Sequence, residues 1–234
     1  MEIQQIPANV ERALSISAHP DDSEFFAGGT LAHLTSNGTE VSLVVATDGA
    51  KGGRNIDNVA RVRRQEQKNA AAELGIKNII SLAYKDGELT PEDAFRVRLI
   101  EIIRQVRPDI IFCHHPQTFY KQYKAISVLG HSDHRATGTA LMEAVYPRAG
   151  SPNFYPGLGG EPWSPREIWL FDCENPDHTV DITAGFAQKI KALEAHISQL
   201  GAGGGLPDAA RKVGHFHGNE SRPAEVFVRL ILRK

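Results

Sequence analysis

Short apolar runs alternate with polar, helix-like stretches over the first two thirds of the chain. The runs rich in Val, Ile and Leu predict buried strands over Ala13–Ser17, Glu40–Ala46, Asn78–Leu82 and Asp109–Cys113. Helix start and stop signals between them predict helices over Phe26–Ser36, Asn58–Leu74 and Thr90–Val106. Repeated strand–helix units joined by short loops favour a Rossmann-like α/β fold, with a mostly parallel sheet and helices on both faces.

The pattern loosens in the last third of the chain. A helix is expected over Arg135–Ala144, and the segment Gly150–Pro165, with four glycines and four prolines, predicts a long surface loop. Strands are predicted over Arg166–Phe171 and Ala224–Leu232, an apolar stripe at helical spacing over Phe186–Leu200, and a flexible glycine run over Gly201–Gly205. We find no internal repeat, so residues 1–234 are expected to form a single domain.

Polar loops follow three of the predicted strands. AHPDD ends the first, TDGAKGG follows the second, and His114-His115 follows the strand that ends at Cys113. Carboxyl ends of parallel strands meet at one rim of a sheet, which is where ligands bind in such folds. These loops are therefore expected to line one site.

Two segments supply pairs of metal-ligand types three residues apart, His19 with Asp22 and His131 with His134. That spacing is one helical turn, so both members of a pair can face the same way. Imidazoles and a carboxylate are the ligands of a catalytic divalent metal. Each cluster alone is also compatible with a helix N-cap, but two such pairs at strand-end loops favour a shared metal site and a metal-dependent hydrolase.

Composition narrows the class of protein. The chain has 41% hydrophobic residues, 23% charged residues and a net charge of −2, so no basic surface for nucleic acid is expected. No signal peptide or run long enough to cross a membrane is seen, and the two cysteines, Cys113 and Cys173, lack CxxC spacing. These features predict a soluble cytoplasmic protein without disulfides.

The motifs together resemble one known family, the LmbE-like or PIG-L zinc-dependent N-deacetylases of amino-sugar substrates. AHPDD followed by HSDH is the specific part of this resemblance, and it extends over roughly residues 13–228. The other matching segments are ATDGAKGG at Ala46–Gly53, Arg63-x-x-Glu66, AAAELG at Ala70–Gly75, Tyr84–Gly87, Lys189, HISQ at His196–Gln199 and AEVF at Ala224–Phe227.

The resemblance implies a residue-by-residue mechanism. His19, Asp22 and His134 would hold Zn2+, with Fe2+ as the competing native metal. Asp21 would be the general base toward water, and His131 would donate a hydrogen bond or proton to the tetrahedral intermediate. Asp133 would orient His131, and Arg63 and Asp86 would contact the sugar. Relatives are often trimers or hexamers, so a homo-oligomer acting on a small amino-sugar is expected.

Two departures from the family pattern affect these roles. Several members carry a tyrosine where Leu129 stands, and that tyrosine is implicated in transition-state stabilisation; Tyr120 or Tyr123 could substitute for it. His114-His115-Pro116 stands where His-Asp-Pro is common, which leaves the roles of His114 and His115 open.

Three other functions compete with N-deacetylation. The first is an amidase that cleaves larger thiol or amide conjugates, and the second is a catalytically silent sugar-binding protein of the same fold. The third is a non-haem iron oxygenase, because two histidines and one carboxylate also form its facial triad. A parallel α/β pattern argues against the oxygenase, since those enzymes usually sit on antiparallel barrels.

Overall fold

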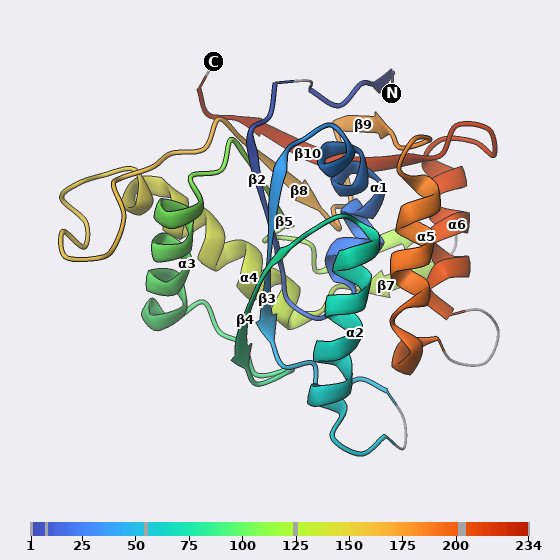
Figure 1. Ribbon diagram of the computed structural model, residues 1–234, viewed down its shortest axis with the longest axis horizontal. Coiled ribbons are helices and arrows are strands. Elements are labelled where there is room, and N and C mark those ends of the chain that lie inside the picture. The colour runs from blue at the N-terminus through green and yellow to red at the C-terminus, as the bar shows by residue number, and fades with distance from the viewer. Residues whose placement is uncertain (1, 8, 54–55, 124–125, 201–204, 234) are drawn as a thin grey trace.

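An eight-stranded sheet runs through the centre of the molecule, with helices on both faces (Figure 1). The computed structural model describes residues 2–7, 9–53, 56–123, 126–200 and 205–233. The strand order is β1-β9-β10-β8-β5-β2-β3-β4. The bounds of these strands are β1 Ile3–Gln4, β2 Arg12–Ser17, β3 Glu40–Thr47, β4 Asn78–Tyr84, β5 Ile110–His114, β8 Glu167–Phe171, β9 His178–Asp181 and β10 Ala224–Ile231.

The sheet is mostly parallel. β8, β5, β2, β3 and β4 pair in parallel with one another in this order, whereas β10 pairs antiparallel with both β8 and β9. This confirms the predicted fold class. The α-helices within the described ranges are α1 Asp22–Ser36, α2 Val59–Glu73, α3 Asp93–Val106, α4 Ser132–Glu143, α5 Phe186–Glu194 and α6 Gly205–His217.

Alternating residues of the central strands enter two separate cores. On β5, Ile110 and Phe112 pack with residues of α1 and α2, whereas Ile111 and Cys113 pack with residues of α3 and α4. Successive side chains of a strand point to opposite faces, so a continuous apolar run is required where both faces are covered. The Val- and Ile-rich strands of the sequence meet this requirement.

The chain changes direction at β2. From β2 it passes outward through β3 to β4, and it then returns to form β5 on the other side of β2. Such a switch point opens a crevice at the carboxyl ends of the strands. The segment Ala18–Asp21 leaves β2 at this crevice, as the sequence predicted.

Several predicted boundaries are corrected by the structure. The first helix begins at Asp22 rather than at Phe26, so the AHPDD motif itself opens the helix. The stripe Phe186–Leu200 is not one helix, because α5 ends at Glu194 and a 3-10 turn follows over Ile197–Gln199. Gly205 already belongs to α6, while residues 201–204 of the predicted flexible run lie outside the described residues.

Among the described residues, β1, β9 and α6 were not predicted, nor was the hairpin of β6 Tyr120–Tyr123 with β7 Ile126–Leu129. A π-helical segment, Ala144–Ala149, also extends α4. None of the helices in the described part of the chain is long and apolar enough to cross a membrane.

Candidate metal centre

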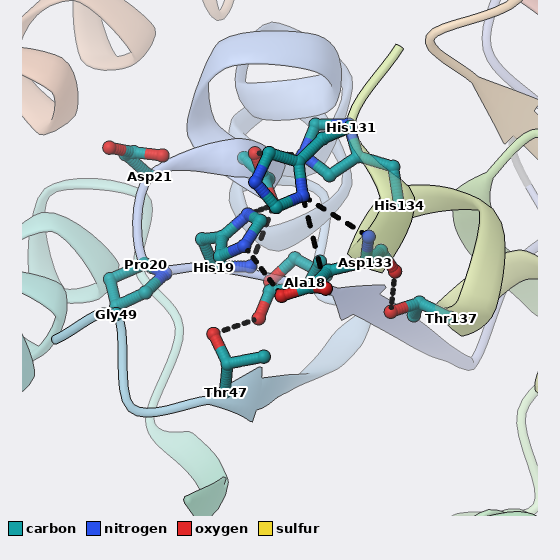
Figure 2. Close-up of polar contacts among 12 residues, drawn as sticks. Ala18, His19, Pro20, Asp21, Thr47, Gly49, His131, Asp133, His134 and Thr137 are labelled. Carbon is teal, nitrogen blue, oxygen red and sulfur yellow. Dashed lines mark hydrogen bonds and ion pairs between the residues drawn. The ribbon is translucent and has the colours of Figure 1, made fainter. Parts of the chain in front are cut away.

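Side chains from four strand ends and two helix starts converge at the rim of the sheet. The contributors are His19 after β2, Asp86 after β4, His114 at the end of β5, Asp172 after β8, Asp22 at the start of α1, and His131, Asp133 and His134 at the start of α4. Figure 2 shows His19, His131, Asp133 and His134 turned toward one another. Segments more than 100 residues apart in the sequence therefore share one site.

His19 lies among three carboxylates. Its Nε2 is 3.2 Å from Asp133 Oδ2 and 3.3 Å from Asp86 Oδ1, and its Nδ1 is 3.4 Å from Asp22 Oδ2. Burial lowers the pKa of His19, but the hydrogen bonds to Asp133, Asp22 and Asp86 outweigh it and raise the pKa to about 12. The cluster thus attracts positive charge.

His134 uses both ring nitrogens. Its Nε2 is 3.3 Å from Asp22 Oδ1, and its Nδ1 is 2.8 Å from Asp172 Oδ2. Burial lowers the pKa of His134, but Asp22 and Asp172 together raise it to about 9. A proton held on Nδ1 by Asp172 leaves the Nε2 lone pair directed at Asp22, which is the arrangement of a metal-binding imidazole.

Three groups in the described residues have donor atoms close enough to hold a metal ion: His19, Asp86 and His131; His19, Asp22 and His134; and His114, His134 and Asp172. The second is the set that the sequence predicted as ligands. Two imidazoles and one carboxylate match the ligand count of a catalytic zinc site, which leaves a position for water. The surplus of carboxylates, which raises the pKa values of both histidines, also fits a bound cation.

No role in the site was predicted from the sequence for His114 or Asp172. His114 is fully buried; its Nε2 accepts the backbone N–H of Ala18 at 3.2 Å and lies 3.1 Å from Asp22 Oδ2. Asp172 forms an ion pair with Lys121 in addition to its bond with His134. Both residues stand at the ends of predicted strands, and that position was the available signal.

Asp21 stands at the edge of this cluster in a strained backbone conformation. Its φ is 100°, in the left-handed region that non-glycine residues rarely adopt, and this costs about 1–3 kcal/mol. Its N–H donates to Gln67 Oε1 at 3.2 Å, and its Oδ2 lies 3.1 Å from Arg63 Nη2. Burial and the charge of Asp22 raise the pKa of Asp21 to about 7, although Arg63 opposes the shift.

The two predicted sugar-binding residues occupy different positions. Arg63, only 4% exposed, donates to the backbone oxygens of Pro20 and Gly49 at 2.6 and 2.9 Å as well as pairing with Asp21. Asp86 accepts the N–H of Lys51 at 2.8 Å through Oδ2 and faces His19 through Oδ1. Both side chains lie next to residues of the site, and contact of either with a sugar stays a prediction.

His131 and Asp133 start α4. The backbone N–H of Asp133 donates to His131 Nδ1 at 3.1 Å, so a neutral His131 carries its proton on Nε2. The Asp133 carboxylate lies 4.0 Å from His131 Nδ1, and it accepts the N–H of Gly87 at 2.7 Å. The contact with the His131 ring is thus made by the backbone amide of Asp133, and the role of its carboxylate in orienting His131 stays a prediction.

Leu129, at the position of the family tyrosine, is 82% exposed on β7. Tyr120 pairs with it across the hairpin and is half exposed. The side chain of Tyr123 lies outside the described residues. These positions do not test whether Tyr120 or Tyr123 replaces the family tyrosine.

Comparison with known proteins places the chain in a family. A model of the PIG-L family, described as GlcNAc-PI de-N-acetylase, matches residues 14–145. The chain is 33% identical over 199 residues to the diacetylchitobiose deacetylase of Thermococcus kodakarensis, which covers 82% of this chain and 71% of that protein. This chain belongs to the PIG-L family.

Further matches agree with this family. The chain is 32% identical over 200 residues to the probable N-acetyl-alpha-D-glucosaminyl L-malate deacetylase 2 of Bacillus cereus, covering 81% of this chain and 84% of that protein. It is also similar to the solved structure of N,N'-diacetylchitobiose deacetylase from Pyrococcus horikoshii, with a TM-score of 0.85, 31% identity and coverage of 98% and 87%. These PIG-L relatives are deacetylases, which confirms the predicted enzyme class.

Replacement of Asp172 is expected to weaken metal binding without removing a ligand. In Asp172→Asn the charge that fixes the Nδ1 proton of His134 is lost, and such outer partners typically contribute 10–100-fold to metal affinity. We therefore expect zinc affinity, measured by competition with a chelator, to fall by about 10–100-fold at unchanged stoichiometry.

Glu167→Gln is the matched control for this change. Glu167 lies at the other end of β8 and pairs with Arg229 at 2.6 Å, so it tests the loss of an ion pair on the same strand away from the site. Equal zinc affinity in Asp172→Asn and the wild type would contradict the role of Asp172.

Proposed function

We propose that this protein removes the acetyl group from an N-acetylglucosamine-type sugar or conjugate, with a metal held by His19, Asp22 and His134. The observation that carries this proposal is the convergence of one potential ligand atom from each of these three residues within 4.8 Å of one another, next to the base candidate Asp21. The named relatives act on diacetylchitobiose and on an N-acetylglucosaminyl malate, which supports an amino-sugar substrate.

Zinc is the metal that we propose, with iron(II) as the alternative. When bound, such an ion polarises the amide carbonyl and lowers the pKa of water. The protein residues supply the remaining chemistry.

Asp21 is suited to take the proton of the attacking water. A base works best when its pKa is near the working pH, and burial raises the pKa of Asp21 to about 7. Arg63 and Gln67 hold the residue in place through its carboxylate and its backbone N–H. Once protonated, Asp21 holds a proton for the leaving nitrogen, so that water and amide become a carboxylic acid and an amine.

His131 stabilises the developing oxyanion in this proposal. Burial lowers the pKa of His131 below its ordinary value, which favours a neutral ring near pH 7. With Nδ1 accepting the N–H of Asp133, the Nε2–H is left as a donor. A neutral donor adds a hydrogen bond to the transition state without a net proton transfer.

Several predictions are not settled by these contacts. Binding of sugar hydroxyls by Arg63 and Asp86, assembly as a trimer or hexamer, and location in the cytoplasm all stay predictions. An amidase for larger conjugates is the second candidate function, and it is favoured by a cavity of about 420 Å³ beside His131 and His134, with Phe25, Phe26 and Leu129 in its wall.

Release of acetate tests the proposed function. Protein stripped of metal and reloaded with zinc should release acetate from N-acetylglucosamine, its malate and inositol glycosides, or diacetylchitobiose. Asp21→Asn should bind zinc with unchanged stoichiometry, while kcat falls by roughly 100-fold or more because the base is lost.

His134→Ala is the contrasting variant, because it should lose zinc and activity together. Full activity of Asp21→Asn would show that another group acts as the base. No acetate from any substrate, with one zinc bound per chain, would overturn the proposed deacetylase.

The pH profile should depend on Arg63. This guanidinium lowers the pKa of Asp21, so Arg63→Gln should raise that pKa further. A base with a higher pKa is protonated over more of the acid range. We expect kcat/KM to fall roughly tenfold at pH 6 and less at pH 9, measured across a pH series.

Arg61→Gln is the control for loss of a cation from α2, because Arg61 is exposed on the same helix. Its pH profile should match that of the wild type. A uniform loss of activity at every pH in Arg63→Gln would instead indicate a role in binding substrate.

A further inference from the structure

A buried ion pair connects α5 and β10 to the helix that carries Asp22. Lys189 of α5 and Glu225 of β10 are each only 3% exposed, and Lys189 Nζ lies 2.6 Å from Glu225 Oε1. α1 packs against both α5 and β10 (Figure 1). Both charged residues belong to segments that match the PIG-L family, yet neither is a candidate metal ligand.

The ion pair binds the backbone of α1 where the helix ladder joins Phe25 to Gly29. In a regular α-helix the N–H of Gly29 donates to the carbonyl oxygen of Phe25. Here Glu225 accepts the N–H groups of Gly29 and Thr30, each at 2.9 Å. It also accepts the Thr30 hydroxyl at 2.6 Å, and Lys189 donates to the Phe25 oxygen at 2.6 Å. The two charges therefore bind the N–H and the oxygen that a regular helix joins to each other.

Two adjacent glycines of α1 allow this close approach. A Cβ at Gly29 would lie 2.6 Å from the Cβ of Ile182, which follows β9, and a Cβ at Gly28 would lie 3.1 Å from Cγ of Lys189. Glycine destabilises a helix interior relative to alanine, so a pair of glycines there needs a reason. The reason in α1 is that α5 and the segment after β9 must reach the helix backbone.

The bonds to α1 begin one turn after the candidate base and metal ligand. The N–H of Phe25 donates to the carbonyl oxygen of Asp21 at 2.9 Å, and the carbonyl oxygen of Phe25 accepts from Lys189. Asp22 is the first residue of this turn. A displacement of Phe25 is therefore transmitted to both Asp21 and Asp22.

Stability alone is a weak reason for such a pair. The loss of water around two buried charges offsets much of their attraction, and apolar side chains of similar size can often replace them without loss of stability. In α1 the Gly29 N–H and the Phe25 oxygen would then bond to each other, as in a regular helix. What the charged pair supplies, and apolar side chains would not, is a fixed link from α1 to α5 and β10.

We propose that Lys189 and Glu225 are positioning residues, which fix the first turn of α1 so that Asp21 and Asp22 meet the other groups of the site. The inference rests on the proposed function for its effect on catalysis, whereas its effect on metal binding does not depend on the substrate. A misplacement of about 1 Å can lower a reaction rate about 100-fold, so a small shift of α1 is enough.

The double variant Lys189→Met/Glu225→Met tests this role. It removes both charges but keeps side chains of similar length, so its melting temperature should stay within about 5 °C of the wild type. Its zinc affinity, measured by competition with a chelator, should fall about tenfold or more, and kcat at saturating zinc should fall at least about tenfold. Each single variant leaves one buried charge without its partner and should melt at least about 10 °C lower than the wild type.

Two further variants separate positioning from general effects. Glu194→Met/Arg211→Met is the matched control, because Glu194 lies on α5 with Lys189 but pairs at 3.2 Å with Arg211 of α6, at the surface. It should keep the zinc affinity and kcat of the wild type. Glu225→Asp keeps the negative charge but withdraws the carboxylate from α1 by one methylene, so it should also lower zinc affinity.

The outcomes distinguish this inference from the proposed function. Wild-type zinc affinity and kcat in the folded double variant would overturn the positioning role and leave the deacetylase intact. If the double variant does not fold, Glu225→Asp decides: wild-type zinc affinity overturns the role, and a lowered affinity supports it. Lowered zinc affinity in these variants, with no acetate released by the wild type, would support the positioning role and overturn the deacetylase.

Discussion

The site depends on the buried carboxylate of Asp22. One of its oxygens accepts the backbone N–H of His19 at 2.7 Å and lies 3.1 Å from His114, while the other lies 3.3 Å from His134. A carboxylate that is only 6% exposed is costly unless such partners surround it. Burial raises its pKa, but His134 and His114 hold the pKa well below its usual range. The ionised group therefore joins the β2 loop, β5 and α4 at one point.

The base candidate is positioned by a different set of contacts. The face of α2 that lies toward the β2 loop is buried although it is polar. On this face Arg63 and Gln67 are 4% and 3% exposed. These two side chains hold Asp21 in its left-handed conformation. Gln67 also donates a hydrogen bond through Nε2 to Glu24 Oε1 at 2.5 Å. The strain at Asp21 is sustained by this polar packing among α2, the β2 loop and Glu24 of α1.

Much of the fold and part of the site were predictable from the sequence. Strands covered on both faces need continuous apolar runs, so β2, β3 and β5 were apparent, and the His19 and His131 motifs marked two sides of one rim. The hairpin β6–β7 was missed because its short, partly polar strands pair only with each other. Helix α6 was missed although Leu206, Ala210 and Val213 have helical spacing. The contacts of His114, Lys121 and Asp172 required the folded chain, since no spacing relates residues from β5, β6 and the end of β8.

The two halves of the site differ in a way that follows from the topology. Loops after β2, β3 and β4 bring charged groups such as Asp21 and Asp86, because they lie on one side of the switch point. On the other side, α1 contributes Phe25 and Phe26, and the β6–β7 hairpin and α6 contribute exposed carbon. Since the β6–β7 hairpin and α6 lie outside the parallel sheet, their exposed apolar side chains can change without altering the strands, whereas Lys121 of β6 reaches the site through its ion pair with Asp172. The sheet therefore holds the candidate metal ligands in place, and the inserted elements form the apolar wall beside them.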